Sequence, residues 1–129
     1  MPLQYSNVDS PWYSEAVRTW QTAQDWTAYG ADTLIVHVRG NADNDAETLY
    51  VAIEDGTGQI TTVSNPNPDV LVTAEWQSWQ IPLGAFSADL TDVAKMYIGI
   101  GSRDLPAAGG SGLIFIDDIR VGLAMESQE

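Results

Sequence analysis

The chain has 129 residues, enough for one domain with a substantial buried core. It contains no cysteine, which excludes disulfides and thiolate metal sites. Its 18 acidic residues outnumber the 5 basic ones and give a formal net charge of -13, which argues against nucleic acid and anionic membranes as partners. No apolar stretch approaches the roughly twenty residues of a membrane-spanning helix.

Short stretches of alternating apolar and polar residues follow one another along the chain, with turn residues between them. About eight short strands spaced in this way favour an all-β fold, an antiparallel two-sheet β-sandwich of the jelly-roll type, over a parallel sheet. We expect residues 1–129 to form one such domain with a frayed tail at 124–129. The clearest predicted strands cover residues 33–39, 49–54, 59–63, 76–83, 96–101 and 113–121.

One group of outward-facing side chains combines aromatic rings with charged and hydrogen-bonding groups. Strand alternation is expected to bring these side chains to one concave sheet face. A sugar site has this composition, because rings stack on apolar C–H faces while arginine, histidine and carboxylates bond to hydroxyls. The alternative is a half-solvated face whose cross-strand pairs serve no ligand. The candidate residues are His37, Arg39, Tyr50, Glu54, Tyr97 and Arg103, with Glu15 or Arg18 from the segment 14–20.

The tryptophans divide into core and surface candidates. Trp79 shares a strand face with Ile81 and Leu83 and is expected in the core, whereas Trp26 is interpreted as a packing anchor. Trp12 and Tyr13 follow a proline in a loop, and loop aromatics at a sandwich edge are the second candidates for stacking on a sugar.

Two adjacent carboxylates, Asp117 and Asp118, interrupt the β-branched and aromatic stretch 113–121 that follows the glycine-rich segment 107–112. Burying a charge in a strand is expensive without a partner. If Ile114 and Ile116 face the core, alternation sends Asp118 there too. A Ca²⁺ ion or backbone amides could neutralise these carboxylates, and the alternative is that both are solvated.

No established catalytic motif is present in the sequence. Two enzyme hypotheses survive on residue type alone. A glycoside hydrolase would use Glu15 and Glu54 as paired carboxylates, and a polysaccharide lyase would use Tyr97, His37 and Arg39 for proton transfer and charge neutralisation.

Several motifs together carry a family likeness, among them Tyr13-Ser14-Glu15-Ala16, Trp79-Gln80-Ile81-Pro82-Leu83 and Phe115-Ile116-Asp117-Asp118-Ile119. The chain resembles the β-jelly-roll, galactose-binding-like modules of secreted bacterial proteins, many of which are carbohydrate-binding modules attached to polysaccharide-degrading enzymes. The resemblance implies a non-catalytic module that binds polysaccharide, secreted or at the cell surface as part of a longer protein. A structural or adhesion domain of a large bacterial surface protein is the alternative, since fold and ligand are only loosely coupled.

The resemblance also implies a structural Ca²⁺ held by a carboxylate of the last strand, here Asp118 or Asp117. Members of this group usually have a further strand or two upstream, with an acidic residue that helps to hold the ion, and the present chain begins where that segment would end. Glu15 or a loop carbonyl would then have to complete the coordination. An uncovered sheet edge recruits other chains, so we expect a homodimer through residues 3–7 or 114–119.

Overall fold

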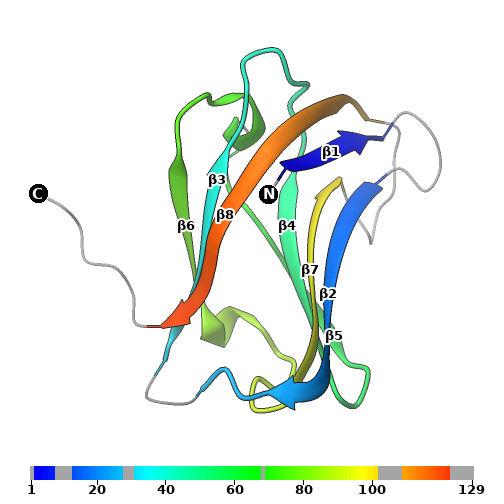
Figure 1. Ribbon diagram of the computed structural model, residues 1–129, viewed down its shortest axis with the longest axis vertical. Helices are drawn as coiled ribbons and strands as arrows, with labels where there is room; N and C mark the ends of the chain where they lie inside the picture. The colour runs from blue at the N-terminus through cyan, green and yellow to red at the C-terminus, as the bar shows by residue number, and fades with distance from the viewer. Residues whose placement is uncertain (1, 8–12, 28–30, 68, 102–108, 123–129) are drawn as a thin grey trace, which may run out of the picture.

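Two four-stranded antiparallel sheets pack face to face in the computed structural model, which describes residues 2–7, 13–27, 31–67, 69–101 and 109–122, without the side chain of Asp118 (Figure 1). Sheet A has the strand order β1-β8-β3-β6, and sheet B has the order β2-β7-β4-β5. The strands of sheet A are β1 (Pro2–Ser6), β8 (Ser111–Gly122), β3 (Thr33–Arg39) and β6 (Gln77–Pro82). Those of sheet B are β2 (Tyr13–Gln24), β7 (Val93–Gly101), β4 (Leu49–Asp55) and β5 (Ile60–Ser64).

The all-β sandwich predicted from the sequence is confirmed, and the strand expected at residues 33–39 has those bounds. Two short 3-10 helices, η2 (Val70–Val72) and η3 (Leu83–Ala85), lie before and after β6. In the described part of the chain, no helix is both long and apolar enough to cross a membrane.

The core lies between the sheets and follows the alternation of each strand. Sheet A contributes the buried row Leu34, Val36 and Val38, and sheet B contributes Val51 and Ile53 among others. Each such side chain stabilises the fold by about 1.5–3 kcal/mol relative to exposure. The predictions for two tryptophans are confirmed: Trp79 is partly buried and packs against this core, and Trp26 is 8% exposed.

The glycine-rich segment before β8 packs closely against the acidic loop between β3 and β4. A Cβ atom on Gly110 would lie 2.2 Å from Cβ of Asp45, and one on Gly109 would lie 2.3 Å from Oε1 of Glu47. The amide of Gly110 donates a 2.8 Å hydrogen bond to Glu47 Oε2. Glycine is therefore required here because the two segments touch.

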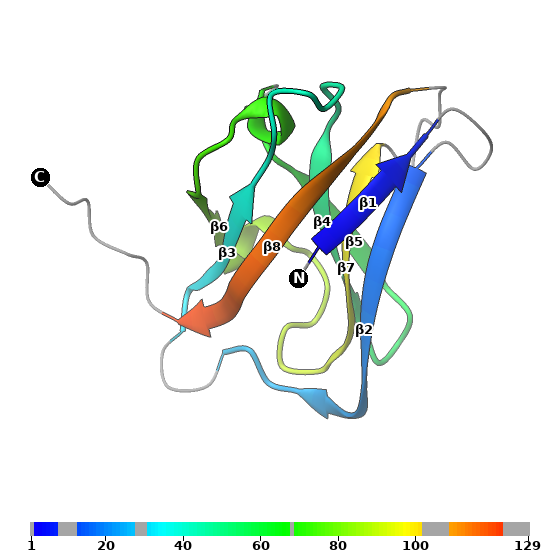
Figure 2. The same cartoon turned by 45° about the horizontal axis from the view of Figure 1, so that its top comes forward.

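The two sheets separate along one edge of the sandwich (Figure 2). β1 pairs only with residues 111–115 of β8, so no described strand covers the side of β8 that faces β2 beyond that point. β8 also contains a bulge. Ile35 pairs with Arg120 and His37 pairs with Asp117, so two residues of β8 lie opposite the single residue Val36.

Candidate functional site

The outer face of sheet B carries two tyrosine–carboxylate pairs. Because Val51, Ile53 and their neighbours point into the core, the alternate positions of the same strands point to the other side of the sheet. We call this surface the tyrosine face and define it by Glu15 on β2, Tyr97 on β7, and Tyr50 and Glu54 on β4.

Tyr50 crosses the neighbouring strand to reach Glu15. Its hydroxyl donates a 2.6 Å hydrogen bond to Glu15 Oε2. Gly99 of β7 lies between the two residues in register, and a Cβ there would come within 2.4 Å of Cζ of Tyr50. The ring is only 1% exposed. Tyr50 therefore orients a carboxylate, and the expectation that its ring is an open stacking platform is wrong.

Tyr97 is the accessible ring of the tyrosine face. It is half-buried, and its hydroxyl donates a 2.8 Å hydrogen bond to Glu54 Oε1. Val17 pairs with Tyr97 on β2 and is 58% exposed. An apolar patch flanked by two oriented carboxylates can contact the C–H face of a sugar and accept hydrogen bonds from its hydroxyls.

The sequence prediction that all the candidate side chains share one face is wrong. His37 and Arg39 belong to β3 of sheet A, where His37 lies opposite Asp117 and Nε of Arg39 donates to the carbonyl of Ala74 at 3.0 Å. The two sheets project their outer faces away from each other, so neither residue can join Tyr97. The same separation divides the Tyr97, His37 and Arg39 set on which the lyase hypothesis depended.

Arg18 is also absent from the tyrosine face. It pairs with Met96, a core residue, so it points to the inner side of β2 at the open edge of the sandwich. Tyr13 starts β2 on the same face as Glu15 and is half-buried. The candidates Trp12 and Arg103 lie outside the described residues.

Of the two proposed metal ligands, the structure describes the side chain of only one. Asp117 is exposed on the outer face of sheet A, and the side chain of Asp118 is outside the described part. Among the described residues, no group of three or more histidine or acidic side chains is placed to hold a metal ion. A calcium site at these two residues stays a prediction, because Ca²⁺ also takes carbonyl and water oxygens among its roughly six to eight ligands.

Sequence reasoning did not select Val17 or Gly99. Val17 lies two residues from Glu15, and this spacing was the available signal for a shared strand face. The role of Gly99 depends on the cross-strand register, which single-strand alternation does not reveal.

The sequence profile described as carbohydrate binding domain 30 matches residues 2–122. The chain belongs to this family. It is thus a carbohydrate-binding module without a catalytic role, and this decides among the binding, structural and enzymatic functions that the sequence left open.

Solved structures of such modules share the sandwich. A family 30 carbohydrate-binding module has a TM-score of 0.68 and 17% identity, with 99% of this chain and 69% of that one covered. A family 11 module from Clostridium thermocellum, in complex with a β-1,3-1,4-mixed-linked tetrasaccharide, has a TM-score of 0.63 and 13% identity over 98% of this chain and 76% of that one. At these identities the likeness shows the fold alone.

A larger enzyme contains the same fold. An exo-β-agarase matches with a TM-score of 0.72 and 15% identity over 97% of this chain, which spans only 20% of the agarase. No curated protein matches the chain.

Proposed function

We propose that the tyrosine face is the surface on which this module binds a polysaccharide. The observation that carries the proposal is the pairing of Tyr97 with exposed Val17, beside Glu54 and Glu15, each of which is oriented by a tyrosine hydroxyl. A face built from four strands offers room for several sugar units in a row. Extended polysaccharide is therefore a better match than a free monosaccharide.

The charge of this face favours a neutral chain. Both carboxylates accept hydrogen bonds and repel carboxylate or sulfate groups brought close to them. Lys95 pairs with Glu54 in register and is the one cationic residue of the described strands on this face. The hydroxyl groups of neutral glucans or galactans can donate hydrogen bonds to both carboxylates.

The test is a substitution at the accessible ring with a matched control on the other sheet. Tyr97→Ala should weaken binding by about 1–2 kcal/mol, roughly 5- to 30-fold, because it removes the stacking surface and releases Glu54. Phe115→Ala, which truncates a 39% exposed ring on the outer face of sheet A, should leave affinity unchanged. Calorimetry with β-1,3-1,4-mixed-linked glucan and with agarose oligosaccharides measures both.

The opposite pattern would overturn the assignment. If Phe115→Ala weakens binding and Tyr97→Ala does not, the glycan lies on sheet A. Thermal melts of both variants exclude unfolding as the cause of a lost affinity.

We propose further that the module acts within a larger, secreted polysaccharide-active protein. The match to a minor part of an agarase supports this, as does membership of a family of binding modules. A module of this kind holds the catalytic part near its polymer and raises the local substrate concentration. Detection of the protein in the medium fraction of the cells that make it would support secretion.

We also propose a structural Ca²⁺ held by Asp118 or Asp117, supported by the resemblance to jelly-roll modules. An ion that binds only the folded state raises the melting temperature. EDTA should therefore lower the melting temperature, and added Ca²⁺ should restore it. Asp118→Asn is the matched control. Its melting temperature should be the same with and without EDTA. An unchanged melt of the native protein in EDTA would contradict this proposal.

Finally, we propose a homodimer through the edge of sheet A at β1. Of the two segments expected to pair, residues 114–119 belong to β8, which β3 pairs on one side and which β1 covers on the other side only as far as Phe115. The segment 3–7 contains most of β1, which is an edge strand of sheet A in the described part. Backbone groups along that edge are the proposed partners for a second copy.

A further inference from the structure

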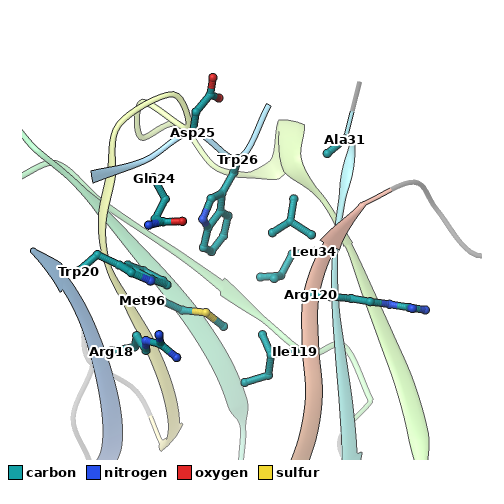
Figure 3. A pocket seen from close by; sticks show the side chains of 11 residues that line it. Arg18, Trp20, Gln24, Asp25, Trp26, Ala31, Leu34, Met96, Ile119 and Arg120 are labelled. Atoms are coloured by element: carbon teal, nitrogen blue, oxygen red, sulfur yellow. The ribbon is translucent and has the colours of Figure 1, made fainter. Parts of the chain in front are cut away.

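A pocket of about 430 Å³ opens between β2 and β8 (Figure 3). Its walls include Trp20, Trp26, Leu34, Met96 and Ile119. The volume lies in the range of small-molecule sites, about 300–1,000 Å³. It fits one sugar unit or a short oligosaccharide, not a long stretch of polymer.

The local sequence explains how the pocket forms. Arg18 and Trp20 are two residues apart on β2, so both point to the inner side of the strand. The Trp20 and Trp26 rings meet edge to face, with centroids 6.1 Å apart and planes at 87°. Across the gap, the bulge in β8 interrupts alternation next to Ile119, which lines the pocket while 42% exposed.

Arg18 brings a positive charge to this pocket. Its guanidinium carbon lies 5.5 Å from the centroid of the Trp20 ring, a cation–π contact that holds the planar group in place. No hydrogen bond or carboxylate contact of Arg18 occurs within the described part of the chain. The chain has 18 acidic residues and 5 basic ones, so an arginine with no carboxylate partner among the described residues stands out.

The other charged side chains that line the pocket point away from it and do not pair with Arg18. Asp25 Oδ1 accepts hydrogen bonds from the amide and the hydroxyl of Thr27, at 2.8 and 2.6 Å, and the carboxylate points away from the pocket (Figure 3). Arg120 also points away, whereas Gln24 directs its amide toward the cavity. The pocket therefore offers indole surfaces, one amide and one guanidinium.

We propose that this pocket is a second sugar site, which takes one pyranose unit bearing a carboxylate or sulfate group. The indole and aliphatic walls match the C–H face of a sugar ring, and the guanidinium matches a planar or tetrahedral oxyanion with two parallel N–H donors. The overall negative charge of the chain is screened beyond about 8 Å at physiological salt, so Arg18 governs the charge preference inside the pocket.

This site is separate from the tyrosine face. Val17 and Tyr97 lie on the outer side of sheet B, and Arg18 lies on its inner side. The two surfaces also differ in charge, because carboxylates line one and a guanidinium lines the other. A module with both would hold a neutral chain on its face and an acidic substituent or branch at its edge.

The experiment follows the indole N–H signals of Trp20 and Trp26 by NMR, assigned from single Trp→Phe variants. The probes are methyl galacturonide, galactose 6-sulfate, neutral methyl galactoside and inorganic sulfate. We expect both signals to move with at least one of the two acidic sugars, and the responsive one identifies the acid group. Arg18→Met, which keeps an apolar stem on Trp20, should weaken that binding about tenfold or more, as expected for loss of a charge-assisted hydrogen bond. Arg39→Met, on the outer face of sheet A, is the matched control and should bind as the native chain does.

Several results would overturn the proposal. Equal shifts with neutral methyl galactoside would remove the acid requirement, and equal shifts with inorganic sulfate would reduce the pocket to an anion site. Unchanged affinity in Arg18→Met, or no response to either acidic sugar, would remove the assignment altogether. Shifts that depend on protein concentration without sugar would mean that a second copy fills the pocket. Tyr97→Ala should leave these shifts intact, so failure here and failure at the tyrosine face are distinguishable.

Discussion

Asn7 is a fully buried polar side chain that joins the two sheets. Its Nδ2 donates to Glu47 Oε2 at 2.9 Å and to the carbonyl of Ile100 in β7 at 3.0 Å, while Oδ1 accepts from the hydroxyl of Ser14 at 2.7 Å. Removing one partner from a buried network leaves the others unsatisfied, which costs about 1–3 kcal/mol. Asn7→Ala should therefore lower the free energy of unfolding by about that amount in urea titrations.

Gln4→Ala provides the comparison for Asn7, because Gln4 is exposed on β1. It should change the free energy of unfolding by less than about 0.5 kcal/mol. Equal effects of the two substitutions would show that the Asn7 network does not connect the sheets energetically.

At the level of single residues, the sequence predicted which side chains face outward better than it predicted which residues contact each other. Alternation placed Tyr50, Glu54 and Tyr97 at outward positions, as observed. The contact of Tyr50 with Glu15 depends on the register of three strands and on the missing side chain of Gly99. Such information is not present in any one strand, so the burial of Tyr50 could not be predicted.

At the level of elements, the turn that joins β4 and β5 is organised by Asp55. Its Oδ2 accepts from the amide of Asp89 at 2.9 Å, and its Oδ1 accepts from the amides of Thr57 and Gln59 and from the Thr57 hydroxyl. These bonds, led by those from Asp89 and the Thr57 hydroxyl, lower the pKa of Asp55 to about 2. The charged form of this carboxylate is the form that stabilises the turn.

The sign of the pH dependence follows from the lowered pKa. The stabilisation is fully present above the ordinary value of 3.8 and is lost as the pH falls through about 2. Asp55→Asn should lower the melting temperature at pH 7, and its difference from the native protein should narrow between pH 4 and pH 2. Asp43→Asn, in an exposed loop, should show no such convergence. A constant difference across this range would contradict the role of the charge.

Strand positions were the most predictable elements. Period-two alternation and turn residues located β3 to within a residue, and they placed β4, β5, β6, β7 and β8 closely. Alternation failed at the β8 bulge, because an extra residue there changes which side the following side chains face. Alternation within single strands does not reveal that β3 and β4 belong to different sheets. The prediction that Arg39 and Tyr97 share a face is wrong for that reason.

At the level of the whole molecule, charge and topology act against each other in self-association. No other described strand pairs with the outer edge of β1, and pairing two copies there about a twofold axis would extend sheet A into one continuous sheet. A net charge of -13 on each copy opposes this contact, and salt screens the repulsion. We therefore expect dimerisation to strengthen with ionic strength.

Sedimentation at tens of micromolar protein, in low salt and in about 0.5 M salt, measures this balance. Gln4→Glu should favour the monomer, because an antiparallel twofold pairing of β1 brings residue 4 of each copy close together, so the added charges repel. Gln21→Glu makes the same change of charge on β2, the edge strand of sheet B, and should leave the dimer intact. If Gln21→Glu alone abolishes the dimer, sheet B supplies the interface. A monomer in both salt conditions would show that the edge of β1 does not recruit a second copy.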